Sequence, residues 1–223
     1  MNPKNIRTIL FDYDGTLHDA LHIYAPAFRK AYEYLVKNGH VEERSWSDDE
    51  ISKFLGQTPK EMWDAFGKGL PESVKREASS IIGSEMERLT NEGQTRLYEG
   101  TIETLRELKR RDYLLVFISN CRNYYMHAHT QLFSLGRYFD HMVCSESYPG
   151  IEAKEKVLET LKPELVEEMV IIGDRHHDMT AGKHNNIHPI GARYGFGDDE
   201  ELSGADMTID DIREVLDIFK GVR

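Results

Sequence analysis

The chain has 223 residues, with 39 acidic and 28 basic side chains and a formal net charge of −11. This length can bury a full core, and it fits one large domain or a domain that carries an insertion. The acidic balance argues against nucleic acid or an anionic membrane as the main partner. Because no apolar run approaches membrane-spanning length and the first residues show no leader pattern, we expect a cytoplasmic protein.

The first predicted element is a short apolar strand that ends in two carboxylates. Residues 6–11 are followed by Asp12, Asp14 and Gly15. Side chains alternate along an extended chain, so Asp12 and Asp14 would share one face, and Gly15 permits a sharp turn. Burying two unpaired like charges would cost about several kcal/mol. A hard cation such as Mg²⁺ is therefore expected beside them.

The residues after Ala20 have the pattern of consecutive helices. A first helix is expected to end at Gly39, a second runs from a capping box at Ser47 to Gly56, and others cover 60–66 and 72–89. A crossover between parallel strands needs only a dozen or more residues, and this block is far longer. We therefore predict a helical cap domain over residues 18–95, inserted into an α/β core formed by residues 1–17 and 96–223.

From Gly100 onward, apolar strands alternate with amphipathic helices. Strands are predicted over 114–118, 142–144, 169–172, 189–192 and 207–209, and helices over 101–111, up to 132, over 154–161 and at the end of the chain. This alternation is typical of a parallel sheet that is covered on both faces. The predicted core is thus an α/β, Rossmann-like fold of three layers.

Polar residues stand where the ligand crevice of such a sheet is expected, beyond the carboxyl ends of the strands. Ser119 and Asn120 follow the second strand, and Asp174 and Asp178 follow the strand over 169–172. Lys154 opens the helix before that strand. These groups are candidates for one site together with the two aspartates of the first strand.

In this order the residues resemble the four motifs of the haloacid dehalogenase superfamily, in its phosphatase branch. The motifs are Asp-x-Asp-Gly-Thr at 12–16, Ser119, Lys154, and Gly-Asp-x-x-x-Asp at 173–178. Residues 173–202 further resemble phosphoglycolate-phosphatase-type members, whereas the helical block agrees with them only in its position and helical character. Lys154 lacks the usual following proline and Lys156 lies nearby, but Lys-Glu-x-Val-Leu resembles a variant form and favours Lys154.

The resemblance implies Mg²⁺-dependent hydrolysis of a small phosphate ester through an aspartyl-phosphate. Asp12 would attack phosphorus, and Asp14 would protonate the leaving alkoxide and then deprotonate the attacking water. Ser119 and Asn120 would bind phosphate oxygens, while Lys154 would balance charge on the nucleophile and the phosphoryl group.

For the metal, the resemblance implies Asp12, the backbone carbonyl of Asp14, and Asp174 as ligands. Asp178 would reach the metal through water or orient Lys154. Thr16 is a further candidate substrate-binding residue and is expected to steady Asp14 through a hydroxyl hydrogen bond.

Two other functions remain open at this point: a phosphomutase resembling β-phosphoglucomutase, and a non-catalytic ligand-binding member of the family. Because the nucleophile, acid and metal ligands are all intact, the hydrolase is preferred. A dehalogenase or phosphonatase would lack an acid such as Asp14. Phosphoglycolate, a sugar phosphate, a nucleotide or pyrophosphate all fit as substrate, and either a monomer or a homodimer fits.

Several further polar residues have less certain roles. His176 and His177 are expected on a loop, exposed and with diverging side chains, and His18 and Asp19 at the first hinge either touch substrate or form a turn. Candidate residues for substrate selection in or beside the helical block are Gln57, Thr58, Lys60 and Arg96.

Overall fold

The computed structural model describes residues 1–57, 59–151, 153–166 and 168–220, and for Pro59 the backbone alone. The chain divides into two compact units. One comprises Met1–His18 with Leu97–Arg223, and the other comprises Asp19–Arg96. The sequence predicts an insertion over residues 18–95 between the two parts of the core.

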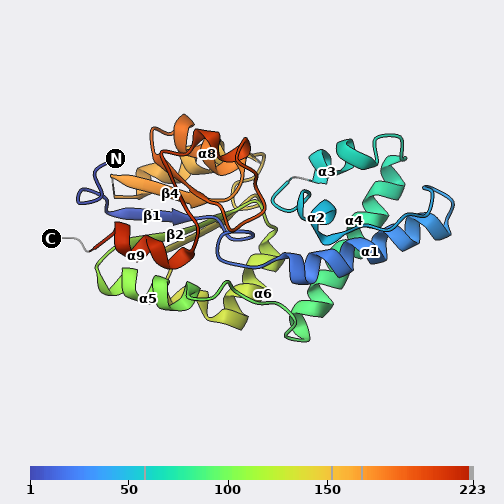
Figure 1. Ribbon diagram of the computed structural model, residues 1–223, viewed down its shortest axis with the longest axis horizontal. Helices are drawn as coiled ribbons and strands as arrows, with labels where there is room; N and C mark the ends of the chain where they lie inside the picture. The colour runs from blue at the N-terminus through green and yellow to red at the C-terminus, as the bar shows by residue number, and fades with distance from the viewer. Residues whose placement is uncertain (58, 152, 167, 221–223) are drawn as a thin grey trace. The chain divides into compact units, whose positions relative to one another are not determined.

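The first unit is built on a parallel sheet of six strands in the order β3-β2-β1-β4-β5-β6 (Figure 1). This confirms the predicted α/β fold with a central parallel sheet. The strands are β1 (Thr8–Phe11), β2 (Leu114–Ser119), β3 (His141–Cys144), β4 (Met169–Gly173), β5 (His188–Ala192) and β6 (Met207–Ile209).

Helices cover both faces of this sheet, with α8 on one face and α5 and α9 on the other (Figure 1). The alternation of strand side chains explains the layers. Leu10 and Val116 point to the face where Val157 of α7 joins them in one buried cluster. The α-helices are α5 (Thr101–Arg110), α6 (Asn123–Phe133), α7 (Lys154–Leu161), α8 (His176–His184) and α9 (Val215–Ile218), with 3₁₀ turns at Leu135–Arg137, Lys162–Glu164, Glu201–Gly204 and Ile212–Glu214.

The register of β1 aligns the ends of the three central strands. Phe11, the last residue of β1, is paired with Phe117 of β2 on one side and with Ile172 of β4 on the other. Residues that follow these three strands must therefore emerge at the same edge of the sheet.

The second unit is all-helical, with α1 (Leu21–Lys37), α2 (Asp48–Ser52), α3 (Pro59–Phe66) and α4 (Glu72–Asn91). The predicted capping box is present, since Ser47 accepts from the Glu50 N–H and the Glu50 side chain accepts from the Ser47 N–H. However, α2 ends at Ser52 and not at Gly56. The following N–H groups, beginning with Phe54, bond three residues back, which makes tight turns in place of α-helix.

Aromatic rings form much of the core of this helical unit. Phe28 of α1 stacks on Phe54 with ring centroids 5.4 Å apart, and it meets the edges of Trp46 and Phe66. Over the described ranges, no helix combines the length and the apolar character that crossing a membrane requires.

Candidate active site

Charged side chains gather at the carboxyl edge of the three central strands. Asp12 follows β1, Ser119 is the last residue of β2, and Asp174 follows β4. Lys154 is the first residue of α7, and Asp178 lies in the first turn of α8. The order β2-β1-β4 explains the convergence, because Asp12 stands between the neighbours that deliver Ser119 and Asp174.

The Lys154 ammonium group connects two of these carboxylates. Its Nζ lies 2.8 Å from Asp12 Oδ1 and 2.7 Å from Asp178 Oδ1, and all three side chains are buried. Burial alone would lower the pKa of Lys154, but the charges of Asp12 and Asp178 outweigh it and raise that pKa. Lys154 therefore stays positive, as the predicted charge-balancing role requires.

Asp12 and Asp178 form a cluster with a third buried carboxylate, that of Asp174. One oxygen from each of Asp12, Asp174 and Asp178 lies within 4.8 Å of the others. Burial and the charge of Asp178 raise the pKa of Asp12 to about 7, and burial with the charge of Asp12 raises that of Asp174 well above its usual value. The negative charge of the three carboxylates is thus only partly balanced, and carboxylate oxygens are the ligands that a hard divalent cation prefers.

Glycines let the chain close around Asp174. A side chain at Gly15, where φ is +84°, would put its Cβ 2.1 Å from Asp174 Oδ2, and one at Gly195 would come 2.3 Å from the Asp174 Cβ. Because Gly15 and Gly195 have no side chains, the backbone can approach Asp174 closely, and the Phe196 N–H donates to Asp174 Oδ2 over 2.7 Å. Residues 173–202 were singled out only for their family resemblance, and the Gly-x-Gly spacing at 195–197 within them was the available signal for this contact.

The hydroxyl of Thr16 also binds this aspartate. It donates to Asp174 Oδ1 over 3.3 Å, which corrects the prediction that it would steady Asp14. The reason is the turn after Asp12, in which Thr16 is fully buried beside the end of β4.

Asp178 is fixed by its own helix start. Its Oδ2 accepts the N–H of Arg175 over 3.1 Å, and its Oδ1 faces Lys154. Gly173 permits this approach, because a Cβ there would lie 2.0 Å from Asp178 Cγ. Asp178 thus has the geometry to orient Lys154, one of its two predicted roles.

Asp14 lies apart from the three clustered carboxylates and contacts a different set of side chains. Its Oδ1 lies 2.7 Å from His18 Nδ1 and accepts the Tyr125 hydroxyl over 3.0 Å. Tyr125 was not predicted as a site residue, since nothing in the sequence pattern of α6 marks one aromatic residue as facing the site. His18 was expected at the first hinge, either touching substrate or forming a turn, and its contact with Asp14 was not predicted.

The predicted phosphate-binding residues lie at the end of β2. Ser119 is buried as the last residue of that strand, and its Oγ accepts the N–H of Cys121 over 3.2 Å. Asn120 follows directly and is half-buried. Burial raises the pKa of the Cys121 thiol well above its usual value, in keeping with a packing role.

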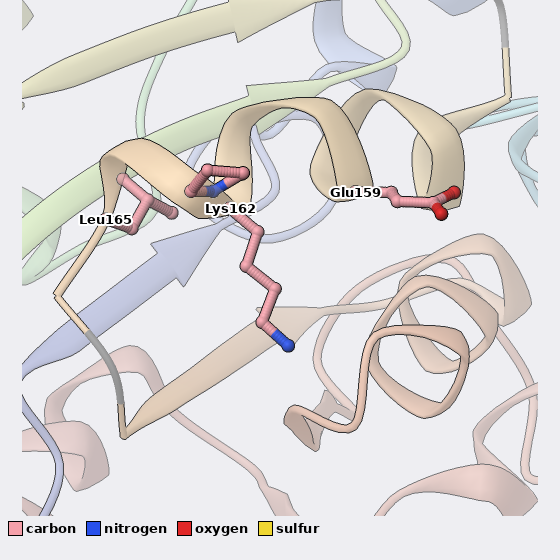
Figure 2. A pocket seen from close by; sticks show the side chains of 4 residues that line it. Glu159, Lys162 and Leu165 are labelled. Carbon is pink, nitrogen blue, oxygen red and sulfur yellow. The ribbon is translucent and has the colours of Figure 1, made fainter.

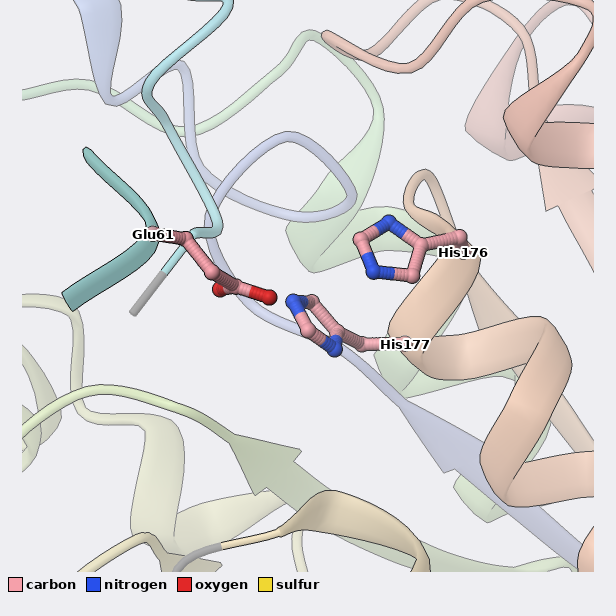
Figure 3. A group of neighbouring side chains, drawn as sticks. All are labelled: Glu61, His176 and His177. Atoms are coloured by element: carbon pink, nitrogen blue, oxygen red, sulfur yellow. The ribbon is translucent and has the colours of Figure 1, made fainter. Parts of the chain in front are cut away.

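His176 and His177 form part of a helix, which corrects the prediction of a loop with diverging side chains. They are the first two residues of α8, and their rings lie side by side with centroids 3.9 Å apart (Figure 3). His176 is exposed and its Nδ1 lies 2.9 Å from Glu201 Oε2. Because the same glutamate binds the buried Arg175 guanidinium, this contact belongs to the support of the α8 start.

Two of the predicted selection residues, Arg96 and Lys60, are paired with nearby carboxylates. Arg96 binds Asp19 Oδ2 through two nitrogens, at 2.9 and 2.6 Å, so these residues join the two ends of the unit. Lys60 Nζ lies 2.7 Å from Asp64 on the same helix. Gln57 is half-buried, and Thr58 lies outside the described residues.

A separate hollow of about 280 Å³ lies at the other end of α7 from Lys154 (Figure 2). Glu159, Lys162, Pro163 and Leu165 line it. Lys162 donates to the backbone oxygen of Asn185 over 2.7 Å, so its charge serves the packing of the fold. We assign no chemistry to this hollow.

Known proteins resemble this chain in sequence and in fold. The family model described as haloacid dehalogenase-like hydrolase matches residues 9–192. A pyrophosphatase of Oceanobacillus iheyensis is 24% identical over 96% of this chain and 97% of its own, and a phosphoglycolate phosphatase of Photobacterium profundum is 24% identical over 97% of each. The solved structure of a haloacid dehalogenase-like hydrolase from Streptococcus pneumoniae superposes with a TM-score of 0.81 at 24% identity, over 98% of this chain and 100% of its own.

Proposed function

The chain belongs to the haloacid dehalogenase-like hydrolases, and from that membership we propose that it is a Mg²⁺-dependent phosphatase that acts on a small phosphate monoester. The observation that carries the proposal is that Lys154 lies within hydrogen-bonding distance of both Asp12 and Asp178, with Asp174 in the same cluster of carboxylates. A carboxylate nucleophile, a fixed cation and a cluster of oxygen ligands are the groups that phosphoryl transfer through an aspartyl-phosphate requires.

A magnesium ion fits this cluster, and Asp12, Asp174 and the backbone carbonyl of Asp14 would hold it. When bound, it would neutralise charge on the phosphoryl group and on the carboxylates. Asp178 orients Lys154, whose Nζ donates a hydrogen bond to Asp178 Oδ1. The raised pKa values of Asp12 and Asp174 support the need for added positive charge.

Asp12 is the nucleophile in this proposal. Its carboxylate attacks phosphorus opposite the leaving oxygen and forms the aspartyl-phosphate. Lys154, 2.8 Å from Asp12 Oδ1, offsets the repulsion between that carboxylate and the phosphate dianion. Ser119 and the Asn120 amide hold phosphate oxygens at the end of β2.

Asp14 is the general acid and base. It gives a proton to the leaving oxygen in the first half of the reaction and takes one from the attacking water in the second. The Asp14 side chain keeps 19% of its surface exposed, whereas Asp12 keeps 7%. This difference supports a role in which Asp14 exchanges protons with ligand and solvent.

The substrate class follows from the relatives and from the second unit. We propose a phosphoglycolate-like phosphomonoester as the substrate and the helical unit as the cap that selects its leaving group. Pyrophosphate is the second candidate, because curated relatives of similar length include pyrophosphatases.

Phosphate release from a panel of compounds tests the proposal. Phosphoglycolate, hexose phosphates, nucleotides and pyrophosphate are compared with Mg²⁺ and with EDTA. We expect Mg²⁺-dependent release that is concentrated on one or two compounds. Conversion of a hexose 1-phosphate to its isomer without release would identify a mutase, and binding without turnover would identify a non-catalytic protein.

A further inference from the structure

A group of buried side chains surrounds the partly exposed carboxylate of Asp14. His18 Nδ1 lies 2.7 Å from Asp14 Oδ1, and the Tyr125 hydroxyl donates to the same oxygen over 3.0 Å. The Tyr125 hydroxyl and His18 Nδ1 are themselves 3.2 Å apart. His18 is fully buried, so Asp14 is the member of the group that a ligand can reach.

The turn after β1 places His18 beside Asp14 Oδ1. The carbonyl oxygen of Tyr13 accepts the N–H groups of Thr16, Leu17 and His18, at 3.2, 2.8 and 2.9 Å. The Gly15 N–H closes the turn by donating to the His18 carbonyl over 2.9 Å. A residue four positions after Asp14 is thereby brought next to it, and the backbone leaves little freedom for another arrangement.

Aromatic rings hold the His18 imidazole in a fixed orientation. The Tyr13 ring stacks on it with centroids 5.0 Å apart and an angle of 10°, and the His129 ring meets it at 4.7 Å and 76°. The Tyr13 hydroxyl and His129 Nδ1 are 2.7 Å apart. Burial, with the nearby His18, lowers the pKa of His129 to about 3, so this ring is neutral and adds no charge near Asp14.

We propose that His18, together with Tyr125, is a positioning residue that fixes the Asp14 carboxyl group through Oδ1 and leaves Oδ2 to carry the transferred proton. The proposal rests on the proposed function of Asp14 as general acid. The Tyr125 hydroxyl is the donor in its 3.0 Å hydrogen bond to Asp14 Oδ1. With the His18 proton on Nδ1, both this N–H and the Tyr125 hydroxyl donate to Oδ1. A proton on that oxygen would oppose them, and the acid proton therefore belongs on Oδ2.

The proton transfer then has a defined geometry. The bond from Asp12 to phosphorus forms as the bond from phosphorus to the leaving oxygen breaks, and the proton passes from Asp14 Oδ2 to that oxygen to give an alcohol. An unfixed carboxyl group would rotate and present the wrong oxygen for part of the time. His18 thus acts on the reaction through Asp14 and does not itself touch the substrate.

Three variants test this role. His18→Leu removes the nitrogen donor. His18→Asn has nearly the shape of His18→Leu but keeps a nitrogen donor at the position of Nδ1. Tyr125→Phe removes the hydroxyl group and keeps the ring. For each we would measure kcat/KM, which covers the steps up to leaving-group release, with two esters. One is the alkyl phosphate that the wild-type chain hydrolyses fastest, and the other is p-nitrophenyl phosphate, whose leaving group needs no acid. Circular dichroism and thermal melting confirm folding.

For His18→Leu we expect kcat/KM for the alkyl ester to fall about 10- to 100-fold, against less than about threefold for p-nitrophenyl phosphate. His18→Asn should recover most of the loss, and Tyr125→Phe should show the same ester dependence to a smaller extent. Equal losses with both esters in folded His18→Leu and Tyr125→Phe would overturn the positioning role. A wild-type chain that hydrolyses neither ester would instead refute the proposed function.

Discussion

Lys154 Nζ lies between Asp12 Oδ1 and Asp178 Oδ1, at 2.8 and 2.7 Å, and no more than 7% of any of the three side chains is exposed. A buried ammonium group held by two carboxylates cannot be removed without leaving unpaired charge in the core. Lys154 is therefore expected to contribute to the stability of the fold as well as to the chemistry of the site.

The first prediction compares two neighbouring lysines. Lys154→Met should lower the free energy of unfolding by about 3–5 kcal/mol in EDTA and lower kcat by at least about 100-fold, because Asp12 and Asp178 lose their common cation. Lys156→Met should change stability by less than about 1 kcal/mol, since Lys156 pairs with Glu159 at the surface. Urea unfolding and phosphate release measure both effects. Similar effects in the two variants would show that Lys154 had been misassigned.

The second prediction concerns the acid. Asp14→Asn should reduce kcat/KM for an alkyl phosphate by about 100-fold or more, and that for p-nitrophenyl phosphate far less, because asparagine cannot supply a proton to the leaving oxygen. Steady-state kinetics with the two esters measure this difference. An unchanged rate with the alkyl ester would exclude Asp14 as the acid.

The third prediction concerns the glycine that packs on Asp174. The Cβ of Gly195→Ala would lie 2.3 Å from Asp174 Cβ and 2.4 Å from the Gly15 oxygen. We expect a loss of about 1–3 kcal/mol in stability and a higher Mg²⁺ concentration for half-maximal activity. Gly136→Ala is the matched control, because its Cβ would meet only Thr130 Cγ2 at 3.7 Å. Wild-type Mg²⁺ dependence in Gly195→Ala would contradict the support given to Asp174.

The fourth prediction concerns pH and the metal. The pKa of Asp12 is raised to about 7 in the folded protein without metal, against about 4 in an unfolded chain. The folded state therefore holds a proton that the unfolded chain releases, and this contribution to stability is lost as pH rises from about 4 through 7. Since Mg²⁺ binds the ionised carboxylate, its stabilising effect should grow over the same range.

Melting temperatures measured in Mg²⁺ and in EDTA at pH 5.5 and pH 8 test this linkage. The increase caused by Mg²⁺ should be larger at pH 8 for the wild-type chain, and this difference should be smaller in Asp12→Asn, in which Asp174 still contributes through its own raised pKa. An Mg²⁺ effect that is the same at both pH values would contradict the account.

Much of the fold could be predicted because its local patterns agree with its tertiary structure. The strand over 207–209 and the helix over 154–161 have the predicted bounds. The predicted end of α2 at Gly56 was wrong. A glycine indicates where a helix can stop, but the change from helix to tight turns after Ser52 depends on local hydrogen bonds that the sequence pattern does not record.

The candidate site was predictable where a residue follows a strand of the sheet. Asp12, Ser119 and Asp174 could be found in this way, because the ends of neighbouring parallel strands meet. The side chains that contact Asp14 could not be found in this way. Tyr125 reaches Asp14 across 111 residues of sequence, and the choice of Thr16 between Asp14 and Asp174 depends on how the turn packs against β4.

The central claim is that Asp12 carries the phosphoryl group. The most direct test is to mix the wild-type chain with its preferred phosphate ester and Mg²⁺, quench in acid within milliseconds, and locate any added phosphoryl group by mass spectrometry of the digested protein. The account predicts phosphorylation on the peptide that contains Asp12, none in Asp12→Asn, and no turnover by that variant. A covalent phosphate on another residue, or normal turnover by Asp12→Asn, would contradict it.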